Sequence, residues 1–235
     1  IYMAISEEPA ERMFNGYDKT FNSTAPVVGD YWKVLYKIVQ ESNILLNRCT
    51  PAIAGNDYTS LTAQARFFRA MAYYYLVETF GPVPLLVEEN TDVIQQAERT
   101  SEQAIYTFII TELNAIKDQL DMTTNSAGKV TNAAVIHFLG KMYLTRAYKS
   151  FAEANDFSEA ATTFDLLIEN PSSGYALQEN FAALFDENNQ ANSEVIWAIQ
   201  YGLDKNYRGG GNPQQAQFGF NIVALEPDMF TKSQS

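Results

Sequence analysis

The side chains that could do chemistry in this chain are one histidine, one cysteine and several carboxylates. His137 and Cys49 are the only residues of their types, and two such ligands do not make a zinc site, which typically has four. No motif around either residue supports a cysteine–histidine nucleophile pair. We therefore expect a structural histidine, and we expect neither a metal nor a cofactor.

Adjacent carboxylates are the next candidates, because two acids can hydrolyse a glycoside. They occur at Glu7–Glu8 and Glu88–Glu89. The reaction needs two carboxyl groups held apart across a sugar, one of them with a raised pKa, whereas neighbouring acids in polar stretches are usually solvated. The run "GGGN" (209–212) lacks the lysine and the helix start of a phosphate-binding loop. The sequence therefore predicts no enzyme.

Two polar loops have the composition of a sugar-binding surface: "NGYDKTFNST" (15–24) and "DKNYRGGGNPQQAQF" (204–218). Aromatic rings stack on sugar faces, polar side chains bind hydroxyls, and such groups gather on loops held by a rigid scaffold. The candidate ligand contacts are Tyr17, Asp18, Phe21, Asn22, Tyr207, Arg208 and Asn212. The alternative is that both are ordinary surface loops.

Helical periodicity dominates the part of the chain that must hold these loops. It predicts helices over 28–48, 57–80, 100–120, 131–149 and 158–169, with Thr131 as an N-cap and a T-x-x-Q capping box at Thr100. "SEVIWAIQY" (193–201) is the best strand candidate, since it is rich in β-branched and aromatic residues. The predicted division is a leading segment (1–27), a helical scaffold (28–170) and a small strand or irregular region (171–235).

The helix over 57–80 is apolar on two faces, which is typical of a helix buried between neighbours. Its aromatic rings are therefore predicted to be core. Arg66 and Arg69 are predicted to be structural, paired with carboxylates or carbonyls, because buried arginine is rarely left unpaired. Trp32 lies on a helix stripe and Trp197 on the strand candidate, so both are also predicted to be core.

Paired helices with short turns suggest a repeat architecture. Ile136, Leu139, Gly140 and Tyr143 have the spacing of the first helix of a tetratricopeptide (TPR) repeat. Ala160 and Phe164 match the second helix, although the turn between the two is several residues too long. We predict an all-α fold, a TPR-like scaffold of helical pairs, with a small β or irregular element near the C-terminal end.

The net charge of −12, from 28 acids and 16 bases, excludes a nucleic-acid partner, since a phosphate backbone needs a basic surface. No apolar run approaches the roughly 20 residues that span a bilayer. With one cysteine there is no internal disulfide. The N-terminal residues show no signal peptide.

Five segments, in order, resemble the SusD/RagB family of outer-membrane proteins from Bacteroidetes. "ARFFRAMAYYYLVETFGPVPLL" (65–86) resembles its signature segment. The flanking segments with the same resemblance are "YWKVLYKIVQESNILL" (31–46), "TSEQAIYTFIITELNAI" (100–116), "GKVTNAAVIHFLGKMYL" (128–144) and "YALQENFAALFDENNQANSEVIWAIQY" (175–201).

The resemblance implies a non-catalytic, lipid-anchored protein on the outer face of the outer membrane. Such a protein captures nutrient, usually an oligosaccharide, and delivers it to a SusC-like TonB-dependent transporter. Family members are longer and begin with an acylated cysteine, which Cys49, inside the fold, cannot be. We therefore interpret the chain as an N-terminal portion whose membrane contact is through an absent lipid anchor. Capture of peptide or another nutrient, and a TPR-like scaffold that binds only proteins, remain alternatives.

Overall fold

The computed structural model describes residues 22–92, 96–124, 126, 128–186 and 188–199. Residues 32–198 form one compact unit. The helices of the described residues are α2 (Pro26–Arg48), α3 (Pro51–Ala54), η1 (Gly55–Asp57), α4 (Tyr58–Phe80), α5 (Glu102–Ile116), α6 (Asn132–Arg146), α7 (Asp156–Ile168), η2 (Pro171–Ser173) and η3 (Phe181–Phe185). None of these helices is long and apolar enough to cross a membrane.

Capping side chains explain where α5 and α6 begin. The Thr131 hydroxyl accepts a hydrogen bond from the Ala134 amide at 3.3 Å, which makes Thr131 the predicted N-cap of α6. At α5 the cap is Ser101, whose hydroxyl accepts from Ala104, and not Thr100. The Thr100 amide instead donates to the Val83 carbonyl at 2.9 Å in an isolated antiparallel bridge. The prediction at Thr100 was wrong by one residue because this long-range bridge fixes its backbone.

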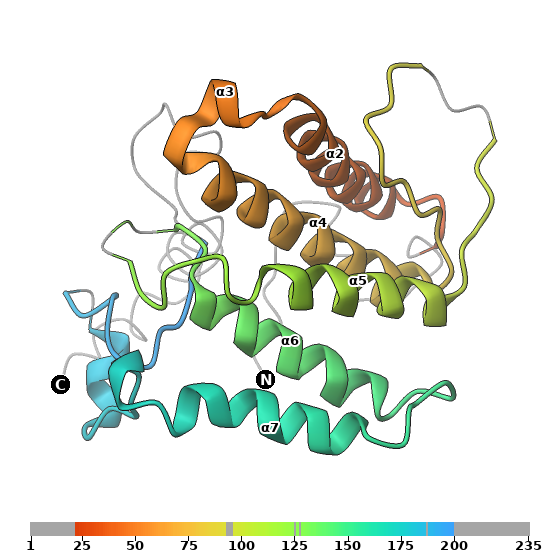
Figure 1. Cartoon of the computed structure of the whole chain (residues 1–235). Coiled ribbons are helices and arrows are strands. Elements are labelled where there is room, and N and C mark those ends of the chain that lie inside the picture. Colours follow the sequence, from red (N-terminus) through yellow and green to blue (C-terminus); the bar gives the residue numbers. More distant parts are fainter. Residues whose placement is uncertain (1–21, 93–95, 125, 127, 187, 200–235) are drawn as a thin grey trace, which may run out of the picture. The chain divides into compact units, whose positions relative to one another are not determined.

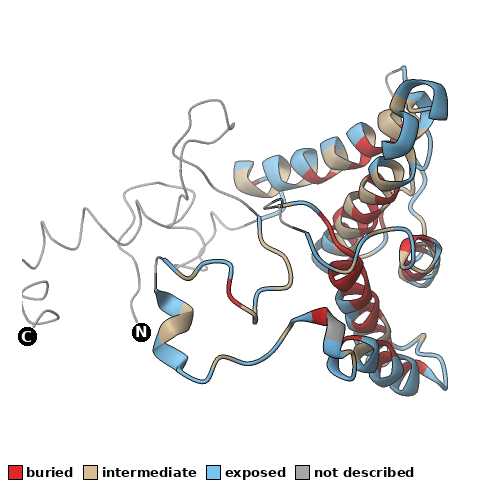
Figure 2. Ribbon diagram, turned by 60° about the vertical axis from the view of Figure 1, so that its left-hand side comes forward, coloured by how far each residue is buried: buried red, intermediate tan, exposed pale blue. Residues whose placement is uncertain are grey.

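The long helices pack as successive neighbours: α4 on α5, α5 on α6 and α6 on α7 (Figure 1). Helix α2 lies against α4, where Trp32 contacts the Phe80 ring and Tyr36 contacts Tyr73. Figure 2 shows the buried residues gathered where the long helices face one another, and α4, α5 and α6 supply most of them. This arrangement confirms the all-α, TPR-like fold of helical pairs.

Helix α4 is packed between α2 and α5, as its two apolar faces predicted. Phe67, Tyr73 and Leu76 are buried, and Phe68 and Tyr74 pack partly buried against the same core. Tyr75 is the exception among the rings, with 41% of its surface exposed. The ring density of α4 therefore serves mainly to fill the core.

The α6–α7 pair shows the close approach that its TPR-like spacing indicates. Gly140 of α6 faces the ring of Phe164 on α7, and a Cβ at residue 140 would lie 2.7 Å from Phe164 Cε1. Only glycine leaves room for the ring at this distance. The long turn between these helices is held by Arg146, which is buried and donates to the Asp156 carboxylate at 2.6 Å and to Glu153 at 2.6 Å.

The strand predicted over residues 193–201 is absent from its described part, residues 193–199. One hydrogen bond joins the Ala176 amide to the Ser193 carbonyl at 3.2 Å, but no ladder follows it. Ile196 and Trp197 of the segment pack on the helices instead, and Trp197 contacts the rings of Phe67 and Phe68. β-Branched and aromatic residues reflect burial as much as strand formation, so the element is irregular.

Candidate functional site

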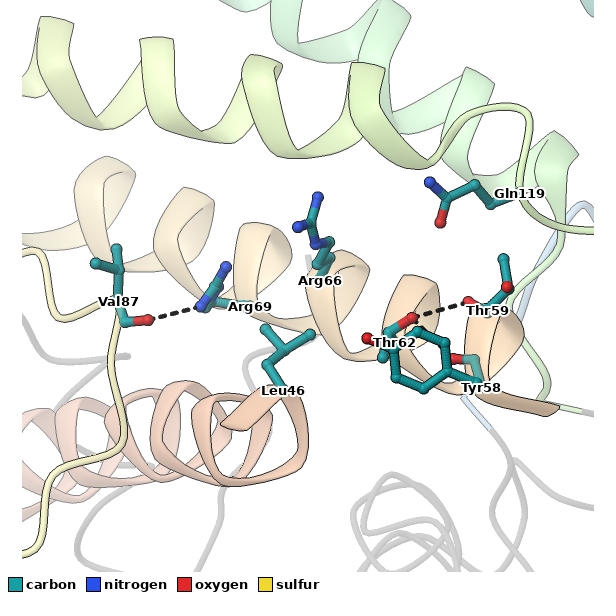
Figure 3. Close-up of a pocket in the computed structure, with 8 residues that line it drawn as sticks. All are labelled: Leu46, Tyr58, Thr59, Thr62, Arg66, Arg69, Val87 and Gln119. Atoms are coloured by element: carbon teal, nitrogen blue, oxygen red, sulfur yellow. Dashed lines mark hydrogen bonds between the residues drawn. The ribbon is translucent and has the colours of Figure 1, made fainter. Parts of the chain in front are cut away.

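A pocket of about 460 Å³ opens between α2, the first half of α4 and Gln119, which lies just beyond the end of α5 (Figure 3). Its lining residues are Leu46, Tyr58, Thr59, Thr62, Arg66, Arg69, Val87 and Gln119. Most of these side chains carry a hydroxyl, amide or guanidinium group, and the volume lies in the range of small-molecule sites. Because the lining combines cationic and hydroxyl groups, the pocket can bind polar or anionic ligands.

Arg69 forms the buried wall of this pocket. Its guanidinium donates to Glu112 Oε2 at 2.5 Å, to Asn43 Oδ1 at 2.7 Å and to the Val87 carbonyl at 3.0 Å. Arg69 and Glu112 are both buried, so their charges are only weakly screened by solvent. These contacts join α2, α4 and α5 through one side chain and fix the position of that wall.

Arg66 lies one turn earlier on α4 and points toward α5 (Figure 3). Its Nη1 is 4.0 Å from Glu112 Oε1, and 38% of its side chain is exposed. Glu112 therefore faces two guanidinium groups, and the closer one, on Arg69, takes its short hydrogen bond. Arg66 keeps donors available to the pocket.

The segment 82–92 closes one side of the pocket at Val87, and polar side chains of α2 and α4 hold it. Asn43 Nδ2 donates to the carbonyls of Leu86 and Glu88 at 3.1 and 2.9 Å. The Tyr73 hydroxyl donates to the Leu86 carbonyl at 2.9 Å and accepts from the Leu86 amide at 2.6 Å. These side chains satisfy backbone groups that a neighbouring strand would otherwise satisfy.

Burial is the main reason that the pKa of Tyr73 is raised, to about 12. Tyr73 is therefore protonated throughout the neutral range, and its hydroxyl can keep donating to Leu86. Burial likewise raises the pKa of Tyr36, whose hydroxyl donates to the Pro84 carbonyl at 2.7 Å. The polar contacts that hold the segment 82–92 thus do not change between mildly acidic and mildly alkaline solution.

The predicted loop contacts lie almost wholly beyond the described residues. Tyr17, Asp18, Phe21, Tyr207, Arg208 and Asn212 are outside the described part of the chain. Asn22 is described and exposed, and its Oδ1 accepts hydrogen bonds from the Thr24 amide at 2.9 Å and the Thr24 hydroxyl at 2.6 Å. Its side chain thus caps a local turn.

The two tryptophans are partly buried against the helical core. Trp32 packs on Tyr36 and Phe80. The Trp197 indole Nε1 donates to the Gly128 carbonyl at 3.0 Å, and its ring lies 5.7 Å from that of Phe67. Both rings are thus engaged in packing.

Sequence reasoning did not find the polar side of the pocket. Thr59, Thr62, Arg66 and Arg69 are spaced 3, 4 and 3 residues apart, which places them along one face of a helix. That polar stripe on an otherwise apolar helix was the available signal. The contribution of Gln119, beyond the end of α5, had no such signal, because only the packing of α4 on α5 brings it there.

The described residues contain no cluster of three or more histidine, cysteine, aspartate or glutamate side chains that could hold a metal ion. His137 contacts the Phe164 ring. Burial first, and then the charge of Lys141, lowers the pKa of His137. The side chain is nevertheless exposed to solvent, so His137 lies at the edge of the α6–α7 contact, and its lowered pKa favours a neutral imidazole there.

Comparison with known proteins places the helical scaffold in a family. Residues 6–144 match the model of SusD-like proteins described as starch-binding and associating with the outer membrane. The chain belongs to the SusD-like family. A SusD-like protein of Bacteroides ovatus is 30% identical over 179 residues, 72% of this chain and 32% of the relative. The starch-binding protein SusD of Bacteroides thetaiotaomicron is 27% identical over 187 residues, 77% of this chain and 32% of the relative.

Solved structures, among them that of a SusD-like protein, share the same arrangement of helices. A crystal structure with xylogluco-oligosaccharide has a TM-score of 0.64 at 28% identity, over 74% of this chain and 35% of that one. A laminarin-binding SusD-like protein has a TM-score of 0.69 at 26% identity, over 80% of this chain and 40% of that one. The chain thus spans about a third of the length of the curated relatives it matches.

Proposed function

We propose that this chain is part of a cell-surface protein that binds oligosaccharide at the outer membrane and delivers it to a SusC-like TonB-dependent transporter. The observation that carries this proposal is the family match over residues 6–144. Relatives described as binding starch and laminarin, and one solved with xylogluco-oligosaccharide, support glycan as the ligand class. Attachment through a lipid anchor in the full-length protein is part of the same proposal.

We propose no catalytic role for this chain. Of the adjacent acids in its described part, Glu89 is held by Arg48 and by Asn47, whose Nδ2 donates to it at 2.8 Å. The hydrogen bond from Arg48, followed by that from Asn47, lowers the pKa of Glu89. A general acid for glycoside hydrolysis needs a raised pKa, so Glu89 is unsuited to that role.

The loop residues Tyr17, Asp18, Phe21, Asn22, Tyr207, Arg208 and Asn212 remain the proposed ligand contacts. A glycan-array screen of the full-length protein, followed by titration of the best ligand, tests both the ligand class and these loops. Replacement of Tyr17 or Tyr207 by alanine should weaken binding about tenfold, because a stacked ring contributes about 1 kcal/mol or more.

Tyr148→Ala is the matched control, because Tyr148 is 77% exposed and lies beyond α6, outside both proposed loops. This control should bind as the wild type does. Binding that survives both loop substitutions would show that the loops are assigned incorrectly and would leave the glycan proposal standing. No binding to any glycan would refute the proposed function in favour of peptide or another nutrient.

A further inference from the structure

The pocket in Figure 3 carries an excess of positive charge in an acidic chain. Its eight lining residues include two arginines and no aspartate or glutamate, whereas the whole chain has a net charge of −12. The nearest carboxylate is Glu112, and it faces both arginines. One negative charge thus compensates two positive charges at this place.

The two arginines differ in how their donors are used. Arg69 is buried and makes short hydrogen bonds to a carboxylate, an amide oxygen and a backbone carbonyl. Arg66 is partly exposed, and its closest carboxylate oxygen is 4.0 Å away, beyond hydrogen-bond distance. Arg66 therefore presents a charged group that solvent or a ligand can reach.

The same pocket also holds side-chain oxygens that can accept hydrogen bonds from the hydroxyl groups of a sugar. The Thr62 hydroxyl donates to the Tyr58 carbonyl at 2.8 Å, which leaves its oxygen free to accept. Gln119 Nε2 donates to the Ala115 carbonyl at 2.8 Å, which leaves its Oε1 as an acceptor. Leu46 and Val87 supply apolar surface at the same pocket. The guanidinium suits the anionic group of an acidic sugar, the acceptor oxygens suit its hydroxyl groups, and the small apolar surfaces suit its ring.

We propose that this pocket binds the anionic group of an acidic oligosaccharide, with Arg66 as the residue that contacts the anion. A guanidinium matches the paired oxygens of a carboxylate or a sulfate. Arg66 carries the positive charge that Glu112, paired with Arg69 at 2.5 Å, leaves uncompensated. Thr62 and Gln119 accept hydroxyl groups of the same sugar. This inference rests on the proposed glycan-binding function and narrows its ligand class to uronic-acid-containing or sulfated glycans.

Isothermal titration of the full-length protein with three probes tests this inference. The probes are a trigalacturonate, a sulfated galactan oligosaccharide and a neutral xylogluco-oligosaccharide. We expect at least one acidic probe to bind, with an affinity that falls as salt is raised. Arg66→Gln should weaken that binding about tenfold, because it removes a charge-assisted contact. Arg66→Lys should weaken binding less than Arg66→Gln does, because lysine keeps the positive charge but lacks the paired N–H donors of a guanidinium.

Two further variants separate a loss of binding from a loss of folding. Arg99→Gln makes the same change in net charge at an exposed residue outside the pocket, and it should bind acidic probes as the wild type does. Gln119→Ala changes an exposed pocket residue beyond the end of α5, so it should fold normally and weaken acidic-probe binding severalfold. Melting temperatures of all variants accompany the titrations.

The outcomes separate this inference from the function on which it rests. Acidic probes that bind Arg66→Gln and wild type equally would overturn the pocket assignment. Binding of the neutral probe alone would overturn the acidic ligand class and leave glycan binding intact. Failure of every probe, together with an empty glycan array, would overturn both proposals.

Discussion

At the scale of single residues, buried charge is what organises the centre of this protein. Arg69 of α4 and Glu112 of α5 are 6% and 8% exposed and 2.5 Å apart. Two such charges are costly to remove from water, and each becomes tolerable only with the other and with further hydrogen bonds. Asn43 and the Val87 carbonyl supply those bonds to Arg69. The ion pair therefore joins α4 to α5, and the hydrogen bonds of Arg69 join α4 to α2 and to the segment 82–92.

Glu112→Gln should destabilise the protein by about 3 kcal/mol, because it leaves Arg69 buried without its counter-charge. Urea unfolding of the variant and the wild type measures this difference. Glu98→Gln, at an exposed position, is the matched control and should stay within about 0.5 kcal/mol of the wild type. A Glu112→Gln variant as stable as that control would mean that Arg69 does not depend on this carboxylate.

At the scale of elements, the packing of one helix on the next depends on how closely their backbones can approach. The α6–α7 contact depends on Gly140, which receives the Phe164 ring, and on Arg146, which joins the end of α6 to the start of α7 through Asp156. The first feature follows TPR-like spacing. The second closes a turn that is longer than a TPR turn, and it does so with a buried ion pair.

Gly140→Ala should destabilise the protein by about 1 kcal/mol, the difference between a cost of overpacking and a gain in helix propensity. Alanine favours a helix over glycine by roughly 1 kcal/mol, but its Cβ would lie 2.7 Å from the Phe164 ring, and overpacking of this kind costs about 1–3 kcal/mol. Thermal unfolding measures the net change. The control is Gly29→Ala in α2, where a Cβ would meet nothing within 4 Å.

Gly29→Ala should be neutral or stabilising, since only helix propensity changes there. If Gly140→Ala proves as stable as Gly29→Ala, the α6–α7 contact adjusts without cost and the glycine is not required for it. A double variant, Gly140→Ala with Phe164→Leu, should recover part of the lost stability because the smaller side chain makes room for the new methyl group.

At the scale of the whole molecule, the described surface carries an apolar stretch that the helical core does not cover. Leu177, Phe181 and Phe185 are 86%, 73% and 75% exposed, and the rings of the last two meet edge to face with centroids 5.3 Å apart. Clustered exposed rings of this kind mark contact surfaces or aggregation sites. In isolation, the 235-residue chain should therefore self-associate.

Phe181→Ser combined with Phe185→Ser should raise the monomeric fraction of the 235-residue chain, because the substitutions remove most of this apolar surface. Size-exclusion chromatography with light scattering measures the monomer fraction. Phe157→Ser, at a 54% exposed phenylalanine outside the stretch, is the control and should not change it. A monodisperse, cooperatively melting wild-type chain would contradict the prediction.

The sequence by itself determined the family, the all-α class and the buried character of α4. These follow from local information: helical periodicity along each segment, the Thr131 cap, and five ordered segments that resemble one family. Ranges such as 57–80 fall within a residue of the observed helix because hydrogen bonds inside a helix join near neighbours.

Only the tertiary structure decided which residues meet across the helices. That Arg66 and Arg69 share Glu112 depends on packing between residues more than 40 positions apart. The same packing of helices places Gln119 at the pocket. Residues 193–199 are irregular because Trp197 packs on Phe67 of α4 and does not pair with a neighbouring strand. The sequence alone predicts that a buried arginine has a partner. Which residue becomes the partner, and whether Arg66 keeps an uncompensated charge, depends on the distances between side chains in the folded protein.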